Sequence, residues 1–166
     1  AASDVYKRQI LVYDPFADAA GVDGQMVSLE ELLGQADVIS VHCCLNEQTR
    51  HLLNRHTLGM LKSGAILVNT ARGAILDAEA ALESLETGRL AGLAMDVYEG
   101  EGGLYFHDHS RDARIDPLLQ RLLEHPRVIV TGHEAFLTEE SLTDIAASTA
   151  ESMLAFSQGH PVPHVL

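Results

Sequence analysis

Long hydrophobic runs are absent from this sequence of 166 residues, although 46% of the residues are hydrophobic. A transmembrane helix needs about 20 consecutive, mainly apolar residues, and no run approaches that length. The sequence therefore predicts no membrane partner. A chain of this size fits a single domain, since domains commonly have roughly 100–200 residues, and its apolar content is enough for a buried core.

Basic residues and metal-ligand pairs are also scarce. The chain has 11 Lys and Arg residues against 24 Asp and Glu residues, a formal net charge of −13. Such a chain repels phosphate backbones, so nucleic acid is not an expected partner. His107 and His109 form a His-Asp-His fragment, but no second ligand pair stands at a recognised spacing. We therefore expect no metal site.

The two cysteines, Cys43 and Cys44, are adjacent in the sequence. Neighbouring cysteines are badly placed for a structural disulfide, and they lack the Cys-X-X-Cys spacing of a redox pair. We interpret both as small buried hydrophobic residues. No secretory signal is visible, so the sequence favours a reducing, cytoplasmic compartment.

Short apolar runs alternate with helical patterns from Ile10 onward. The segment 1–9 has no apolar periodicity, and we interpret it as an unrelated leader or a cloning or sequencing scar. The apolar runs are almost continuous rather than alternating, which is typical of parallel strands covered on both faces. They predict strands at 10–13, 38–43, 65–69, 92–97 and 128–132.

The helices between these strands have recognisable ends. Ser28 precedes a helix and Glu31 follows three residues later, which is the pattern of a capping box. Asp77 precedes the next helix and Gly88 ends it, while Pro117 opens a third helix at a position where proline is tolerated. Alternating strands and helices predict an α/β fold with a doubly wound parallel sheet.

A last helix is expected at 139–158. Its apolar face carries Leu142, Ile145, Ala146, Thr149 and Met153. The helix either covers the sheet or belongs to another layer. We therefore divide the chain into a sheet domain at 10–136 and a C-terminal helix with its tail at 137–166.

Polar residues follow the ends of successive predicted strands. In doubly wound sheets the ligand binds beyond the carboxyl ends of the strands, so these residues form the candidate site. They are Asp14, His42, Cys43, Cys44, Thr70, Ala71, Arg72, Asp96, Glu101 and His133.

Each candidate also has an ordinary structural interpretation. Asp14 either accepts hydrogen bonds from both hydroxyls of an adenosine ribose or opens an Asp-Pro turn. Arg72 either binds a substrate carboxylate through two hydrogen bonds or pairs with a neighbouring acidic residue. His133 suits a general acid or base, and Glu101 either stabilises its protonated form or lies in solvent. A glycine-rich phosphate loop, expected one strand earlier, is absent.

The sequence contains five long motifs in order: VYDPF, ADVISVHCCLNEQTRHLLN, MLKSGAILVNTARGAILD, GLAMDVYEGE and VTGHEAFLTEESL. In order and separation they resemble the family of D-isomer-specific 2-hydroxyacid dehydrogenases over roughly 9–156. Within that family, EGEGGLYFHDHS and GHEAFLT are most similar to fermentative D-lactate dehydrogenases. The resemblance implies a Rossmann-like NAD-binding domain, NAD as cofactor, a small 2-oxo or 2-hydroxy acid as substrate, and a homo-oligomer at full length.

The resemblance also implies roles for individual residues. Arg72 matches the arginine that anchors the substrate carboxylate, His133 matches the proton donor, and Glu101 matches its paired carboxylate. Asp14 matches the ligand of the adenosine ribose, and Asp96 matches an aspartate near the nicotinamide. The residues that fall on the wall of the cofactor cleft are Cys43, Cys44, Thr49, Thr70, Ala71 and Arg72.

Two further positions bear on the substrate and on the fit to the family. Phe136 falls where D-lactate enzymes close over a small substrate side chain, which favours reduction of pyruvate to D-lactate. Cys44 stands where the family usually has a proline. The alternatives are the same chemistry on another 2-oxo acid, and a non-catalytic NAD-sensing regulator. The presence of Arg72, Glu101 and His133 together favours an enzyme.

The family pattern also implies parts that this sequence lacks. Members are about twice this length, as expected for two domains. The substrate domain, the first dinucleotide-binding strand and the glycine loop are missing, so the NAD-binding domain is N-terminally truncated. The helix at 139–158 would pack on the missing substrate domain. We therefore expect this polypeptide to be inactive by itself.

Overall fold

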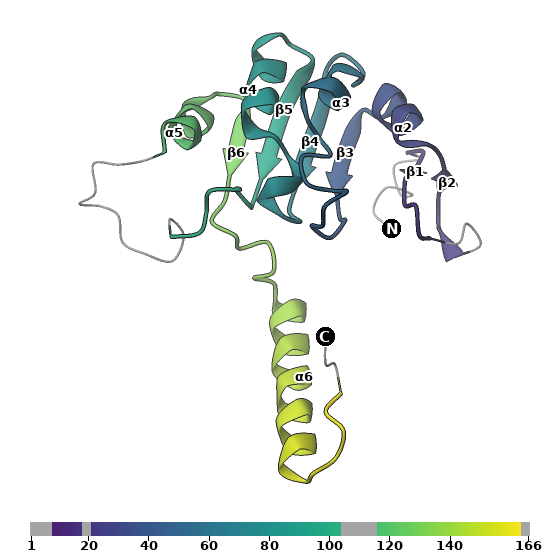
Figure 1. Cartoon of the computed structure of the whole chain (residues 1–166), viewed down its shortest axis with the longest axis vertical. Helices are drawn as coiled ribbons and strands as arrows, with labels where there is room; N and C mark the ends of the chain where they lie inside the picture. Colours follow the sequence, from purple (N-terminus) through teal and green to yellow (C-terminus); the bar gives the residue numbers. More distant parts are fainter. Residues whose placement is uncertain (1–7, 18–20, 104–115, 164–166) are drawn as a thin grey trace. The chain divides into compact units, whose positions relative to one another are not determined.

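The computed structural model describes residues 8–17, 21–103 and 116–163. The chain divides into two units, Ala1–Gly132 and His133–Leu166. Helices and short strands alternate along the first unit (Figure 1). Its elements are β1 (Leu11–Val12), β2 (Gln25–Met26), α2 (Leu29–Gln35), β3 (Val38–Val41), α3 (Arg55–Gly59), β4 (Ala65–Asn69), the 3-10 turn η2 (Gly73–Ile75), α4 (Ala78–Glu86), β5 (Leu90–Met95), α5 (Pro117–Glu124) and β6 (Val128–Val130).

A parallel four-stranded sheet organises the first unit. Its strand order is β3-β4-β5-β6, and the register pairs Ile39 with Leu67 and Leu67 with Leu93. The predicted parallel α/β fold is therefore confirmed. The first predicted strand, β1, lies outside this sheet: among the described residues it pairs with β2, in a separate two-stranded parallel sheet.

The strand predicted at 65–69 has these bounds in the structure, and the other four lie within two residues of theirs. Three short elements, β2, α3 and η2, were not expected. They have two, five and three residues, which is too short for an apolar period to be visible in the sequence.

The predicted helix ends are formed by the expected residues. The Ser28 hydroxyl accepts the N–H of Glu31 at 3.2 Å, and the Glu31 carboxylate accepts the N–H of Ser28 at 2.9 Å. This reciprocal pair is the capping box of α2. Asp77 caps α4 through Ala80 N–H at 3.0 Å. Gly88 follows α4 in the left-handed region, with φ of 74°, where glycine has no steric penalty.

The core lies on one face of the four-stranded sheet. Helices α2, α3, α4 and α5 all contribute leucines to a single cluster that includes Ile39, Leu67 and Leu93. The alternate side chains point to the other face, where Val38 is 50% exposed and Ile66 is 42% exposed. The prediction that both faces are covered is therefore wrong for the described part of the chain. Continuous apolar strands indicate that a second covering layer suits this sheet.

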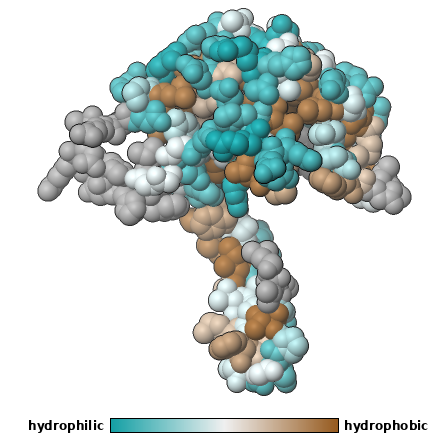
Figure 2. All heavy atoms as spheres, in the orientation of Figure 1, coloured by the Kyte–Doolittle hydropathy of each residue, from teal (hydrophilic) through white to brown (hydrophobic). Residues whose placement is uncertain are grey.

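The second unit contains helix α6, Glu139–Ser157, close to the bounds expected from the sequence. The Thr138 hydroxyl accepts the N–H of Ser141 at 3.1 Å and caps its first turn. None of its residues is buried. Several of its apolar side chains are exposed, and Met153 is 68% exposed. Brown patches lie over this helix in Figure 2. Among the described helices, none combines the length and apolar content needed to cross a membrane.

The one-sided core predicts different costs for two neighbouring substitutions in β4. Leu67 is fully buried and Ile66 is 42% exposed. Leu67→Ala should lower the free energy of unfolding of this chain by about 2–5 kcal/mol, since it leaves a cavity. Ile66→Ala should cost roughly 1 kcal/mol or less, because its side chain lies on the open face. Urea unfolding followed by circular dichroism measures both, and equal losses would show that the open face is in fact covered.

Candidate functional site

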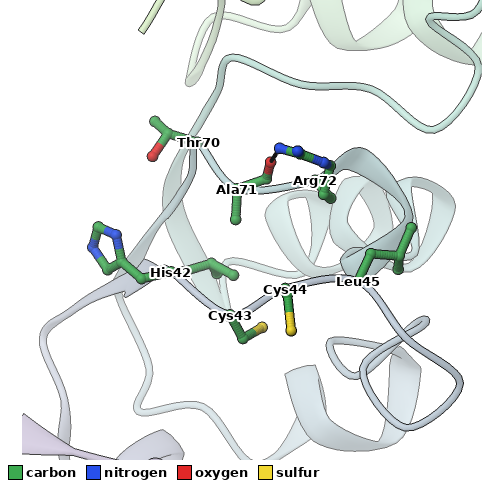
Figure 3. A pocket seen from close by; sticks show the side chains of 8 residues that line it. His42, Cys43, Cys44, Leu45, Thr70, Ala71 and Arg72 are labelled. Carbon is green, nitrogen blue, oxygen red and sulfur yellow. Dashed lines mark hydrogen bonds between the residues drawn. The ribbon is translucent and has the colours of Figure 1, made fainter. Parts of the chain in front are cut away.

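A pocket of about 480 Å³ lies beyond the carboxyl ends of β3 and β4, which run parallel and end at the same edge. Figure 3 shows side chains from the two strand-end loops on opposite sides of it. The lining residues are Val41, His42, Cys43, Cys44, Leu45, Thr70, Ala71 and Arg72. The structure therefore brings five predicted wall residues, Cys43, Cys44, Thr70, Ala71 and Arg72, into one site.

The turn after β4 is built around the buried side chain of Asn69. Its Nδ2 donates to the carbonyl oxygen of Arg72 at 3.0 Å, and its Oδ1 accepts the N–H of Ala71 at 3.1 Å. A fully buried amide is stable when its donors and acceptors are satisfied. Asn69 thus fixes the backbone that carries Arg72 into the pocket wall.

Arg72 is exposed, and its guanidinium bends back over the preceding peptide. Its Nη1 donates to the carbonyl oxygen of Ala71 at 2.7 Å (Figure 3). No carboxylate pairs with it among residues 8–17, 21–103 and 116–163. The ordinary interpretation, a surface arginine held by a neighbouring acid, is therefore not what the structure shows.

Cys43 and Cys44 lie on the opposite wall. Cys43 is half-buried and Cys44 is exposed, so the interpretation of both as buried hydrophobic residues is wrong. Burial raises the pKa of the Cys43 thiol, and the charges of Cys44 and Asp14 also raise it. Thr49 is absent from the lining and supports the wall from behind: its hydroxyl donates to the carbonyl oxygen of Cys44 at 2.7 Å.

Asp14 follows β1 and is exposed. Its Oδ1 accepts the N–H of Phe16 at 2.9 Å, which is the hydrogen bond of an Asx turn. The structural interpretation of this aspartate is therefore confirmed. Its ribose role stays a prediction.

Asp96 directly follows β5 and is 4% exposed. Its backbone N–H donates to the carbonyl oxygen of Asn69 at 3.0 Å, and its carboxylate accepts a hydrogen bond from the hydroxyl of Thr131. A buried carboxylate needs such partners. Asp96 thus links the ends of β4, β5 and β6, and its predicted place near a nicotinamide remains untested.

Glu101 lies in a tight turn after β5. Its Oε2 accepts the N–H of Tyr98 at 2.8 Å, and its own N–H donates to the carbonyl oxygen of Tyr98 at 3.1 Å. The buried ring of Tyr98 donates its hydroxyl proton to Asp116 at 2.7 Å. This hydrogen bond, aided by the N–H of Leu118, lowers the pKa of the Asp116 carboxyl. The turn is therefore anchored to the start of α5.

His133 and Phe136 belong to the second unit. His133 adopts a left-handed backbone conformation with φ of 58°, and Phe136 is 46% exposed. The convergence of Arg72, Glu101 and His133 on one cleft stays a prediction, as does the substrate contact of Phe136. His107 and His109 lie outside the described residues. The described residues contain no group of three or more His, Cys, Asp or Glu side chains arranged for a metal ion.

Three residues at the site were missing from the predicted set. Val41 and Leu45 line the pocket, and Asn69 holds the arginine turn. His42, which also lines the pocket, was among the predicted strand-end residues. Asn69 has a weaker signal, a polar residue that closes an otherwise apolar strand. Leu45 has none, because an isolated leucine in a loop indicates no chemistry.

The pocket wall fits one side of a nicotinamide cofactor. Its lining contains the small side chains of Cys43, Thr70 and Ala71, which leave room for a flat ring against the backbone. Arg72 adds the positive charge that suits an anionic ligand. A parallel sheet with such a pocket beyond its strand ends defines a nucleotide-binding domain of the doubly wound class.

The chain belongs to the D-isomer-specific 2-hydroxyacid dehydrogenases. Residues 3–135 match the family described as "D-isomer specific 2-hydroxyacid dehydrogenase, NAD binding domain". The family assignment, the α/β fold and NAD as the cofactor are thereby confirmed.

Named relatives and solved structures support the same family. The chain is 45% identical over 149 residues to 2-hydroxyacid dehydrogenase A of Aspergillus oryzae, covering 89% of this chain and 43% of the relative. It is 39% identical to the D-lactate dehydrogenase of Escherichia coli, covering 95% and 49%. A crystal structure of a D-lactate dehydrogenase from Treponema pallidum superposes with a TM-score of 0.89 at 37% identity, covering 98% and 50%. The chain thus spans about half the length of these relatives.

The unequal burial of the two cysteines predicts unequal thiol reactivity. A thiol reacts as the thiolate, and a raised pKa leaves Cys43 with less thiolate at neutral pH. Cys44 in a Cys43→Ser chain should therefore react faster with a small maleimide than Cys43 in a Cys44→Ser chain. Mass spectrometry over time measures both rates, with urea-unfolded chains as controls, and equal rates in the folded chains would refute the assignment.

Proposed function

We propose that this chain forms the NAD-binding half of an enzyme that reduces pyruvate to D-lactate with NADH. The proposal rests on one observation: Arg72 lines a pocket at the strand ends, and no carboxylate of the described residues pairs with it. The names of the E. coli and T. pallidum relatives, both D-lactate dehydrogenases, support the choice of substrate.

Substrate binding is assigned to Arg72. NAD supplies the hydride chemistry when bound, and Cys43, Thr70 and Ala71 would hold it against the pocket wall. The planar guanidinium of Arg72 offers two parallel hydrogen bonds to the substrate carboxylate. To bind the substrate, the guanidinium must release the carbonyl oxygen of Ala71. It then donates to a charged carboxylate in place of a neutral carbonyl, which makes the stronger hydrogen bond.

Proton transfer is assigned to His133 and Glu101. As the substrate carbonyl gains electrons, its oxygen becomes basic, and the imidazolium of His133 gives it a proton. The carboxylate of Glu101 favours the charged imidazole that must do this. In the reverse reaction, His133 takes the proton from the substrate hydroxyl.

The proposal applies to the complete polypeptide. The described pocket walls come only from the loops after β3 and β4, so one side of the site is open. We propose that these 166 residues alone do not turn over substrate, since catalysis needs a closed, water-poor site around the reacting atoms.

A bulkier 2-oxo acid is the second candidate substrate. It is supported by a D-2-hydroxyisocaproate dehydrogenase, whose structure matches the chain with a TM-score of 0.85 at 32% identity. Comparing kcat/KM for pyruvate and for a branched six-carbon 2-oxo acid with the complete enzyme separates the two. A preference for the branched acid would overturn pyruvate as the substrate.

Substitution of the two assigned side chains separates binding from proton transfer. In the complete enzyme, Arg72→Lys keeps the charge but loses the planar fork, so kcat/KM for pyruvate should fall by roughly 10- to 100-fold. His133→Gln removes the titrating group, so kcat should fall by about 10²- to 10⁴-fold. Steady-state kinetics measures both losses.

Cofactor affinity and melting temperature are the controls for these variants. NADH affinity should change little in either variant, because neither side chain is proposed to carry the cofactor's binding energy. A joint loss of NADH binding and thermal stability would indicate a folding defect. A His133→Gln enzyme with full activity would remove the proton donor from the proposal.

Asp14 predicts the choice between the two nicotinamide cofactors. A carboxylate at this strand end should repel the 2′-phosphate of NADPH, so the complete enzyme should prefer NADH in kcat/KM. Asp14→Asn should reduce that preference by roughly tenfold, since one charge interaction of about 1 kcal/mol or more is lost. Asp23→Asn, at another exposed aspartate, is the control and should leave the preference unchanged. Equal effects of the two substitutions would contradict the ribose role.

A further inference from the structure

Three segments that are far apart in the sequence meet beside the pocket: 49–53, 72–76 and 98–101. We call this contact the loop junction. Two backbone hydrogen bonds, of 2.8 and 3.1 Å, join the first segment to the second. The third rests on the second at Gly73, where an added Cβ would lie 2.1 Å from the carbonyl carbon of Tyr98. The Tyr98–Glu99 peptide therefore lies directly against the residue that follows Arg72.

Side chains close the loop junction at Glu99. Its Oε1 forms an ion pair with Arg50, and its Oε2 hydrogen bonds to the Nε2 of His51 at 2.7 Å. The two partners stand 49 and 48 residues away in the sequence. Glu99 is 34% exposed and His51 is 39% exposed, so solvent only partly screens this pair. Glu99 thus ties segment 98–101 to segment 49–53.

The position of Glu101 depends on the same peptide that Glu99 holds. The Glu101 carboxylate and its backbone N–H both bond to Tyr98. Glu99 lies between these two residues. The Tyr98 carbonyl that accepts the N–H of Glu101 belongs to the Tyr98–Glu99 peptide, so a shift of the Glu99 backbone moves the acceptor that holds the Glu101 backbone.

The backbone conformation of His51 also indicates that contacts within the loop junction hold this residue in place. His51 has φ of 49°, a left-handed conformation that is uncommon for a side chain other than glycine. Such a conformation persists where surrounding contacts compensate its cost. Its N–H bonds to the carbonyl oxygen of Ala74 at 2.8 Å and its ring bonds to Glu99.

We propose that Glu99 is a positioning residue: clamped by Arg50 and His51, it holds the turn that presents the Glu101 carboxylate at the edge of the site. Glu99 is not among the residues that line the pocket, and in this role it acts through Glu101. The inference rests on the proposed function, because the place of Glu101 matters to the reaction only if it stabilises the protonated form of His133.

The test compares two glutamates in the complete enzyme. Glu99→Gln removes the charge of the clamp, and Glu83→Gln removes the charge of a similar surface pair on α4, where Glu83 bonds to Arg55 at 2.8 and 2.5 Å. With Glu99→Gln, kcat for pyruvate reduction should fall by roughly threefold to tenfold, since neighbouring residues couple through shared contacts. The KM for pyruvate and the affinity for NADH should each change by less than about twofold, because Glu99 is not proposed to hold either ligand. Glu83→Gln should leave all three unchanged.

The pH profile tells positioning from a general loss of structure. Reduction needs a protonated imidazole, so its rate falls as pH rises through the alkaline limb of the profile. Glu101→Gln removes the carboxylate that favours imidazolium, and should move this limb to lower pH. Glu99→Gln should move it in the same direction by a smaller amount. The double variant should have the limb of Glu101→Gln alone, because the effect of Glu99 passes through Glu101.

Each outcome decides the matter. A Glu99→Gln profile that equals that of Glu83→Gln, with a normal Glu101→Gln effect, would overturn the positioning role and leave the proposed function intact. A double variant shifted beyond Glu101→Gln would also overturn it, since Glu99 would then act through its own charge. If Glu101→Gln leaves the profile unchanged, the role of Glu101 in the proposed function fails, and the inference fails with it.

Discussion

The hydrogen-bonded parallel ladder of β3, β4, β5 and β6 is the constraint on which the site depends. Because all four strands run in one direction, their carboxyl ends lie at one edge of the sheet. Residues that follow different strands are thereby gathered at that edge. The ladder explains why the pocket combines loops 28 residues apart, such as those of Cys44 and Arg72.

Buried polar side chains, rather than the proposed catalytic and binding residues, hold this edge of the sheet in place. Asn69 satisfies its amide within the turn that carries Arg72, and Asp96 connects the ends of three strands. Tyr98 anchors the turn of Glu101 to α5. Buried, satisfied polar groups restrict the backbone to one arrangement. The exposed side chain of Arg72 is therefore positioned by residues that are themselves buried.

Much of the fold could be predicted because its signals are local. Ser28 with Glu31, and Asp77 with Ala80, mark helix starts by hydrogen bonds that span three residues, and Pro117 marks the first position of α5. The apolar run at 65–69 marks a strand by composition alone. The short strand β2 could not be predicted, since it depends on its pairing with β1 earlier in the chain. Helix α3 is capped locally by Asn54 but is too short to show a helical apolar period.

The candidate site divides in the same way. Arg72, Cys43 and Thr70 were predicted as strand-end residues, and the structure gathers them into one pocket. The exposure of Cys44, the supporting place of Thr49 and the Glu99 clamp were not predicted. Each depends on which residue from another segment lies beside it, and a sequence pattern contains no such distances.

The sequence by itself determined the order of strands and helices, the caps and the family motifs, because these depend on residues close together along the chain. The tertiary structure alone decided that the core covers one face of the sheet, with Leu67 buried and Ile66 exposed. An apolar run has the same composition whether one or both of its faces are covered. Which face is buried depends on where the helices pack, and that is set by contacts between residues far apart in the sequence.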